Sequence, residues 1–540
     1  MKRRAGAIAA LFSMAVYLAA GGACSPLWAS NGVFPVSGGS RAAGRGGADA
    51  AVADDAYAMN TNPAGITQLY GLHLDNSMGL FHVDANYEDP QNSGVDNVNR
   101  FFPVANGGIV FSPDFFEASR VETQSFSEAE LMGFDDEDEG EDETVWKKYE
   151  PAIPSPWRFG AGIFTQGGAG TDFHGIRTRN YGPPGFPGGV THRTNFALLS
   201  LAPTVAYQLT DELSIGGAFN LNYGRIDLDM PFSQDAGILQ GPSIPGLPPA
   251  FNFGNSFKLI EDLFGDGRDE ITGITAVQKA VAWGYGCRFG VLWKPNDEWS
   301  FGADWASQTY MNDFVGKVHL DFDAEISNLP DFPFPNLFEA IIRGFVTGLT
   351  GNPVLSAIES DGRIRIRDFQ FPQRATVGVA YRPNRDWLLA ADVKWINWSK
   401  TFKTFVADID KLNSDELPIL LGGGSIHAVL PLKWADQWVF ALGTEYRWDD
   451  DLTFRFGMNY GRNIIPPSTY LVIFPATTEF HMTGGFSYRL APNMTLDVAY
   501  EHAFQKVLRA DDHWPLGLDY FNSKYTVKQD TVTFGIQYDF

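Results

Sequence analysis

The 540-residue chain is poor in cysteine and in positive charge, and after its first residues it has no long apolar run. Of its 2 cysteines, Cys24 falls in an expected leader, so Cys287 is left without a disulfide partner or the neighbours of a cysteine-based metal site. The formal net charge of -24 argues against a nucleic-acid partner held through phosphate contacts. Without an apolar run of about 20 residues, a membrane could be crossed only by strands.

The sequence also lacks the spacing of a known catalytic or metal site. Its 9 histidines are scattered and form no HExxH motif, and no nucleophile stands beside a base in a recognisable pattern. The acidic run FDDEDEGEDE at 134–143 has a partial calcium-loop rhythm, but Trp146 stands where a bidentate Glu is needed. We therefore expect that the protein is not an enzyme and that it has no cofactor and no metal. We expect the acidic run to be a solvated outer loop, and divalent bridging to lipopolysaccharide is a minor alternative role for it.

The amino terminus, MKRRAGAIAALFSMAVYLAAGGACSPLWAS, has a basic start, an apolar centre and a small-residue exit. This order is typical of a secretory signal peptide, which we assign to residues 1–29 with cleavage after Ala29. Cleavage before Cys24, as in a lipoprotein, is an alternative, but Gly21 stands where a branched apolar residue is expected.

What the chain does have is glycine, aromatic residues and alternation. It contains 57 glycines and 14% aromatic residues, which favour turn-rich β structure. Apolar and polar residues alternate in DLTFRFGMNY at 451–460 and in the closing TVTFGIQYDF at 531–540. This is the pattern of a strand with one apolar face. Trp293, Trp299, Trp387 and Trp448 stand at strand ends, where an aromatic girdle would meet lipid head groups.

Fourteen such segments can be counted, and short polar turns alternate with long loops between them. This pattern predicts an all-β protein, a 14-stranded antiparallel transmembrane β-barrel over residues 69–540 with long extracellular loops at about 115–150, 230–275 and 323–363. The expected strands lie near 72–88, 105–112, 157–166, 195–209, 212–229, 276–295, 298–322, 364–382, 386–408, 430–448, 451–462, 478–490, 493–507 and 524–540.

Three arginines fall within expected strands and must face the lumen. An Arg on the lipid face at mid-depth costs about 2–4 kcal/mol, whereas a lumenal Arg can be paired. Arg288, Arg374 and Arg455 are therefore candidates to hold a carboxylate head group. The alternative is that they only pair with lumenal acids such as Asp392 and Glu445.

Residues 30–68 do not fit the barrel pattern. The run SGGSRAAGRGGADAAVADDAYAMNTNPAGI is small and Gly/Ala-rich, its second half suggests short helical turns closed by an Asn-Pro break, and it could pack inside a confined lumen. This run, with its Asn62-Pro63-Ala64 motif, resembles the amino-terminal hatch of the FadL family of outer-membrane long-chain fatty acid transporters. The resemblance continues through LAPTVAYQLTDELSIGGAFNLNYG and FQFPQRATVGVAYRPNRDWLLAADVKWINWSKTF to the last strand.

The resemblance implies a barrel of the bacterial outer membrane plugged by the hatch. It implies uptake of fatty acids or other hydrophobic compounds by facilitated diffusion, with capture between outer loops and lateral release beside a kinked third strand. Other implied partners are outer-membrane lipid, lipopolysaccharide and, through Phe540, the barrel assembly machinery, and the protein is expected to be a monomer. The rival classes are a lipid-acting outer-membrane enzyme and a general porin or structural barrel.

Two features of the sequence can be matched to this implied path. The third expected strand contains Gly167, Gly168 and Gly170, which would permit a kink or merely mark the strand's end. Two expected outer loops are unusually apolar and would either pack as a lid or leave a groove for alkyl chains. The groove candidates are Phe257, Ile260, Leu263, Phe264, Leu337, Phe338, Ile341, Ile342 and Phe345.

Overall fold

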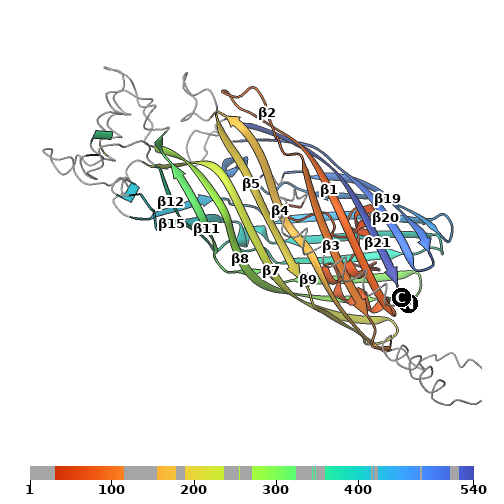
Figure 1. Ribbon diagram of the computed structural model, residues 1–540. Coiled ribbons are helices and arrows are strands. Elements are labelled where there is room, and N and C mark those ends of the chain that lie inside the picture. The colour runs from red at the N-terminus through yellow and green to blue at the C-terminus, as the bar shows by residue number, and fades with distance from the viewer. Residues whose placement is uncertain are drawn as a thin grey trace, which may run out of the picture.

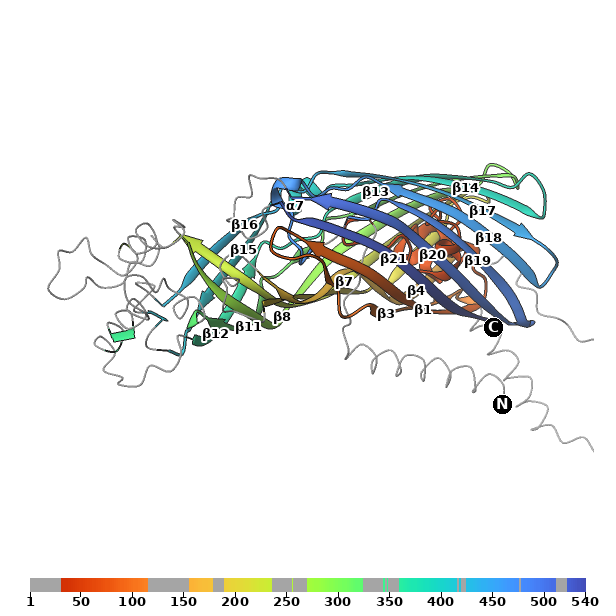
Figure 2. The same cartoon turned by 90° about the horizontal axis from the view of Figure 1, so that it is seen from above.

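The structure is a computed structural model in which a ring of strands surrounds a coiled amino-terminal segment (Figures 1 and 2). No helix among the residues it describes is long and apolar enough to cross a membrane. The described residues are 31–114, 155–177, 189–235, 255, 270–323, 343–344, 347, 359–414, 417–418, 424–474, 477–510 and 522–540.

The elements follow one another as a series of antiparallel neighbours. Their bounds are α2 Ser40–Gly44, η1 Ala56–Asn60, η2 Pro63–Gln68, β1 Leu72–Glu88, β2 Val95–Asp96, β3 Phe101–Phe111, β4 Trp157–Ile176, β5 Val190–Leu201, β6 Thr204–Gln208, β7 Leu213–Asp235, β8 Glu270–Trp293, β9 Trp299–Ala306, β10 Tyr310–Met311, β11 Phe314–Asp321, β12 Glu359–Arg367, β13 Arg374–Tyr381, β14 Trp387–Ile396, α7 Trp398–Thr401, β15 Thr404–Asp410, β16 Ile426–Pro431, β17 Gln437–Arg447, β18 Leu452–Gly461, η4 Pro467–Thr469, β19 Phe480–Ala491, β20 Met494–Arg509 and β21 Lys524–Asp539.

Several wall strands are interrupted, and joining their pieces gives a ring of 14. The joined pieces are β5 with β6, β9 with β10 and β11, β12 with β13, β14 with β15, and β16 with β17. Strand β2 is a short addition that pairs with β1. The ring closes because β1 pairs with β21 from His73 opposite Asp539 to Glu88 opposite Lys524. The predicted fold class and strand number are confirmed, and no sheet edge is left at this seam.

The wall alternates as the sequence predicts. Along β9, Trp299, Phe301 and Trp305 are exposed on the outer face, whereas Ser300 and Asp304 are buried inside. The third and fourth strands are longer than expected, because β4 runs to Ile176 and β5 starts at Val190. Sequence alternation underestimates β4 because its residues 164–171 are all buried, so that the polar–apolar rhythm is lost there.

The interior has two zones. The coiled segment with α2, η1 and η2 fills the end of the barrel that carries the short turns and the carboxyl terminus (Figure 1). Strands β7, β8, β11, β12 and β15 extend beyond the barrel at the opposite, long-loop end (Figures 1 and 2). Toward that end the lumen is filled by an apolar cluster that includes Phe34, Phe196, Phe369, Trp398 and Phe402, which we call the outer apolar cluster.

Candidate functional site: the hatch and the lumen above it

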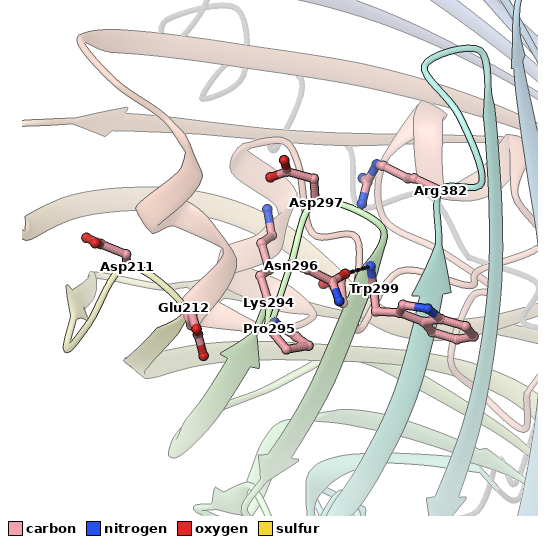
Figure 3. Close-up of a pocket in the computed structure, with 9 residues that line it drawn as sticks. Asp211, Glu212, Lys294, Pro295, Asn296, Asp297, Trp299 and Arg382 are labelled. Atoms are coloured by element: carbon pink, nitrogen blue, oxygen red, sulfur yellow. Dashed lines mark hydrogen bonds between the residues drawn. The ribbon is translucent and has the colours of Figure 1, made fainter.

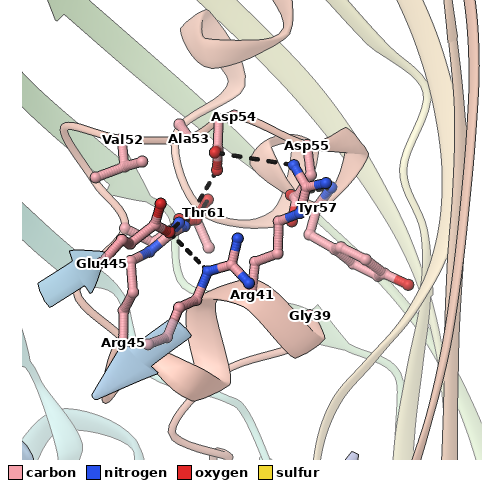
Figure 4. Close-up of polar contacts among 12 residues, drawn as sticks. Gly39, Arg41, Arg45, Val52, Ala53, Asp54, Asp55, Tyr57, Thr61 and Glu445 are labelled. Atoms are coloured by element: carbon pink, nitrogen blue, oxygen red, sulfur yellow. Dashed lines mark hydrogen bonds and ion pairs between the residues drawn. The ribbon is translucent and has the colours of Figure 1, made fainter. Parts of the chain in front are cut away.

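Two arginines tie the amino-terminal segment, the hatch, to the barrel wall (Figure 4). Arg45 is fully buried and contacts Glu445 of β17 through Nη1, while its Nη2 lies 2.5 Å from Asp49 and 3.2 Å from Asp54. Arg41 lies 3.4 Å from Asp497 of β20. The positive charges of Arg41 and Arg45 are therefore balanced partly by aspartates of the hatch and partly by acidic residues of the barrel wall.

The charges of this network hold one another ionised. Burial would lower the pKa of Arg45, but Asp54, Glu445 and Asp49 outweigh it and raise that pKa well above the ordinary value. Burial would raise the pKa of Asp54, but Arg45 and Arg41 together bring it below its usual range. Asp55 differs, because burial and its acidic neighbours raise its pKa well above the ordinary value. The network is thus a set of true ion pairs beside one carboxyl that favours its neutral form.

The Asn62-Pro63-Ala64 motif begins η2 and joins two parts of the hatch to each other and to strand β8 of the wall. Asn62 is fully buried; its Oδ1 accepts from the Ala64 backbone N–H at 3.2 Å and caps the turn. Its Nδ2 donates to the Ala50 carbonyl at 2.7 Å and to the Val291 carbonyl of β8 at 2.9 Å. Gly290 makes this approach possible, because a Cβ there would lie 2.1 Å from Asn62 Oδ1.

Strand β4 leaves its neighbour part-way along the barrel. The β3–β4 ladder runs only from Phe111 opposite Phe159 to Gly107 opposite Ile163. The β4–β5 register then shifts between Thr165 and Gly167, where the predicted glycines Gly167, Gly168 and Gly170 begin. The wall between β3 and β4 therefore lacks ladder hydrogen bonds over this stretch, which we call the β3–β4 gap.

The hatch fills the β3–β4 gap from inside. Gly168 N–H donates to the Val33 carbonyl at 2.9 Å, so the start of the described chain lies against the displaced part of β4. Asn106 of β3 bridges the rest: its Nδ2 donates to the Gly38 carbonyl at 2.8 Å, and its Oδ1 accepts from Thr165 N–H at 2.7 Å. The gap is closed by side chains and by the hatch, not by strand pairing.

The three predicted arginines all face the lumen, but they do different things. Arg455 contacts Glu445 at 2.7 Å and Asp497 at 3.7 Å, and Arg288 contacts Asp304 at 2.8 Å. Both are almost fully buried, and Arg288 also donates to the Thr61 carbonyl of the hatch at 2.8 Å. These contacts match the alternative of paired lumenal arginines.

Asp392 does not pair with an arginine as suggested from the sequence. Its Oδ2 accepts from the backbone N–H groups of Asp49 and Ala50, each at 2.8 Å, and so caps the hatch. The sequence could not show this contact, because the hatch lies more than 300 positions away from Asp392 along the chain. The donors are also backbone N–H groups, which every residue type except proline carries, so no side chain marks them in the sequence.

Arg374 has no carboxylate partner among the described residues. Its Nη2 donates to Gln166 Oε1 at 2.7 Å, and its guanidinium lies 4.6 Å from the ring centre of Phe34. Gln166 Nε2 donates in turn to Asn60 Oδ1 in η1. The partly accessible guanidinium of Arg374 is thus linked to the hatch through Gln166 of β4.

The outer apolar cluster begins beside this cation. Phe34 lies 4.9 Å from Trp398, ring centre to ring centre, and Trp398 lies 4.9 Å from Phe402. Phe402 continues to Trp434 at 4.5 Å and to Phe369 at 5.1 Å. The positive charge of Arg374 at the foot of a large apolar cluster is complementary to a long apolar molecule with an anionic end.

Sequence reasoning missed Gln166, Asn60 and Lys394. The charge of Lys394 on β14 interacts with those of Arg374 and Asp304. Alternation from Asp392 would have placed Lys394 in the lumen, since the two residues are two positions apart. Gln166 precedes Gly167 and Gly168, Asn60 lies in the run AYAMNTN, and nothing in either local sequence signals a contact between them.

The groove candidates lie outside the described residues: Phe257, Ile260, Leu263, Phe264, Leu337, Phe338, Ile341, Ile342 and Phe345. The expected leader and the acidic run lie outside them as well. Within the described ranges, no three His, Cys, Asp or Glu side chains are grouped so that they could hold a metal ion.

A polar cleft of about 490 Å³ opens at the short-turn end (Figure 3). It is lined by Asp211, Glu212, Lys294, Pro295, Asn296, Asp297, Trp299, Ser300 and Arg382. Lys294 Nζ donates to Gln68 Oε1 of the hatch, and Ser300 Oγ donates to the Ala51 carbonyl at 2.6 Å. Burial, and next the charge of Arg382, lowers the pKa of Lys294 to about 8. With this polar lining the cleft is unsuited to an apolar ligand.

A family model, similar proteins and solved structures all relate this chain to outer-membrane transport proteins. The model of the family described as outer membrane protein transport protein (OMPP1/FadL/TodX) matches residues 33–540. The long-chain fatty acid transport protein of Salmonella typhi is 22% identical over 351 residues, which cover 65% of this chain and 67% of that protein.

Solved structures show the same fold. The P. putida toluene transporter TodX aligns with a TM-score of 0.64 at 18% identity, over 94% of this chain and 99% of that one. The Ralstonia pickettii toluene transporter TbuX aligns with a TM-score of 0.60 at 20% identity, over 94% of this chain and 99% of that one. This chain is therefore an outer-membrane β-barrel that belongs to the OMPP1/FadL/TodX family of outer membrane transport proteins.

Proposed function

We propose that this protein takes up long-chain fatty acids, or hydrophobic molecules with a comparable anionic end, by facilitated diffusion. The observation that carries the proposal is Arg374, a lumenal cation without a described carboxylate partner at the foot of the outer apolar cluster. The relatives' names include both fatty acid and toluene transporters. A neutral aromatic molecule would gain only a cation–π contact here, whereas a carboxylate would gain an ion pair with charge-assisted hydrogen bonds, so the charge favours the fatty acid.

The apolar cluster supplies the energetic reason for a transporter. Each methylene removed from water contributes about 0.8 kcal/mol, so a chain of about 16 carbons gains on the order of 12 kcal/mol. A water-filled pore offers none of this. In the proposal, the outer loops with Phe257 and Phe338 capture the chain, and the outer apolar cluster receives it by side-chain rearrangement.

Release follows from the contacts of Arg374. A carboxylate at Arg374 would compete with Gln166 for the guanidinium, and Gln166 also donates to Asn60 of the hatch. Loss of these bonds would loosen the hatch beside Gly167 and Gly168, where the wall is not closed by a ladder. The ligand would then leave sideways through the β3–β4 gap into the membrane. Binding and opening are coupled in this scheme because one side chain serves both.

The test replaces the cation and varies the ligand. Arg374→Gln should lower uptake of a radiolabelled long-chain fatty acid into vesicles by about tenfold, the loss expected for one charge-assisted hydrogen-bonded pair. Uptake of an alkane of equal length should change little. Arg374→Lys should retain part of the fatty acid uptake, and Arg385→Gln, at an exposed short turn, is the matched control. Equal loss for both ligands, or no loss for either, would remove Arg374 from the path.

A further inference from the structure

The height of the lipid-facing band can be read along β8. Its outward residues from Trp293 to Trp283 are mostly large and apolar, and Trp283 and Tyr285 are 55% and 58% exposed. Ten residue steps at about 3.3 Å, on a strand tilted by about 40°, give a height of about 25 Å, which is the usual apolar band of such barrels. Tyr223 and Tyr310 contact these two rings, at 5.1 and 5.8 Å respectively. The band therefore ends near this aromatic patch at the long-loop side.

Immediately above this patch the outer face becomes basic. Val281 pairs with Val315, Val315 with Arg365, and Lys317 with Arg363, so these positions form adjacent cross-strand rows on β8, β11 and β12. Ile364 and Ile366, which alternate with the arginines, are buried inside the barrel, and the arginines therefore face outward. We call the outward cations Lys279, Lys317, Arg363, Arg365 and Arg367 the basic collar.

The basic collar is only partly neutralised. Arg363 pairs with Asp410, Arg367 lies 2.7 Å from Asp408, and Arg365 reaches Asp313 only at 3.9 Å. The ammonium groups of Lys279 and Lys317 have no carboxylate within ion-pair distance among the described residues. Two lysines and one weakly paired arginine are thus available on one patch. Exposed ion pairs of this kind contribute little to stability, so their acids do not explain the collar.

We propose that the basic collar binds the phosphate groups of lipopolysaccharide, the phosphorylated glycolipid of the outer leaflet. The collar continues directly from the lipid-facing band, so its depth is that of the lipid head groups. Phosphate oxygens accept charge-assisted hydrogen bonds from Lys and Arg, and Arg365 can present two N–H groups to one phosphate. The occupant is chosen by position and by the free cations of the collar. A surface at this depth is in contact with lipid, and Lys279, Lys317 and Arg365 lie between the aromatic patch and the exposed acids Glu359 and Asp361 further along β12.

This assignment goes beyond transport. It predicts an annular glycolipid held on the side of the barrel formed by β8, β11 and β12, three of the strands that extend beyond the barrel at the long-loop end (Figure 2). It does not depend on Arg374 or on the proposed substrate.

The experiment measures binding of purified lipopolysaccharide to the full-length protein in detergent. Lys317→Gln/Arg365→Gln should raise the Kd by about tenfold or more, since each removed cation weakens head-group binding severalfold. Arg385→Gln/Arg489→Gln removes the same charge at short turns and should leave the Kd within about twofold, because those side chains lie at the other end of the barrel. The wild-type affinity should fall as salt is added.

Two further arms keep the outcome clear. Lys317→Arg/Arg365→Lys keeps both charges and should bind nearly as the wild type does, which separates loss of charge from a folding defect. Lipopolysaccharide stripped of phosphate should bind the wild type at least as weakly as the intact glycolipid binds the double Gln variant, which keeps the other cations of the collar. Equal binding of intact glycolipid by wild type and double Gln variant, or equal binding of intact and dephosphorylated glycolipid, would overturn the proposal.

Discussion

The arginines of the lumen differ in whether a described carboxylate pairs with them. Arg45, Arg288 and Arg455 each contact at least one carboxylate and either belong to the hatch or contact a residue that the hatch engages. Removing one partner of such a pair leaves a buried charge, which typically costs about 3–5 kcal/mol. Among the described residues Arg374 has no such carboxylate, so no ion pair of the described fold depends on its charge.

At the same scale, Lys294 gives stability a dependence on pH. Its folded pKa of about 8 lies below the value of about 10.4 for an unfolded lysine. Below pH 8 both states are protonated and the cost of burying the charge is fully present. Between about pH 8 and 10.4 the unfolded chain binds more protons, so the free energy of unfolding rises with pH.

We therefore expect the wild type to gain stability across this window relative to Lys294→Met, by up to about 3 kcal/mol. Urea unfolding in vesicles at pH 7.5, 9 and 10.5 measures the difference. Comparison with the variant cancels groups that titrate in both proteins. A constant difference between the two proteins from pH 7.5 to 10.5 would show that Lys294 stays charged in the fold.

At the scale of elements, the hatch fits the wall because wall strands lack side chains where it touches them. A Cβ at Gly302 of β9 would lie 1.8 Å from the Ala50 carbonyl oxygen, and one at Gly457 of β18 would lie 2.3 Å from the backbone of Arg45. These contacts are backbone against backbone, which cannot be relieved by a side-chain rotation. Glycines of the wall, together with the Gly/Ala-rich sequence of the hatch, thus allow the backbones of the hatch and the wall to pack against each other.

Gly302→Ala should accordingly displace the hatch while leaving the barrel closed. We expect faster proteolysis within residues 40–68 in the folded protein and raised ion conductance in planar bilayers. Gly217→Ala on β7 is the matched control, because a Cβ there meets Phe289 at an ordinary 3.6 Å. A hatch equally protected in both variants would mean that the wall moves to make room for the methyl group.

Local pattern predicted the barrel well and the site only in part. Period-two alternation is a property of each strand, so the ring of 14 and the inward arginines could be found without knowledge of their neighbours. The β4 displacement hides the same signal, since residues 164–171 are buried throughout. The links between Gln166 and Asn60 and between Asp392 and the hatch join distant positions, and no local rule specifies which polar groups will meet.

At the scale of the whole molecule, the proposed path depends on which parts of the lumen are apolar and which are polar. The outer half of the lumen is apolar, the short-turn end is polar and filled by the hatch, and the membrane lies at the side. A molecule that prefers hydrocarbon has no reason to pass the polar end, where its methylenes would meet water again. In the proposed path such a molecule leaves through the side of the barrel, and the β3–β4 gap is a described part of the wall where the ladder is interrupted and the hatch fills the opening.

A reversible lock across the β3–β4 gap tests this path. Gly168 N–H and the Val33 carbonyl are 2.9 Å apart, so their Cα atoms are within the reach of a disulfide, about 4.4–6.8 Å. In a Cys287→Ser background, Val33→Cys/Gly168→Cys should lose most fatty acid uptake on oxidation and recover it on reduction, because the hatch can no longer leave β4. Each single-cysteine variant should transport equally in both conditions. Full uptake by the oxidised double variant, with the disulfide verified by mass spectrometry, would show that ligand leaves the barrel without moving this contact.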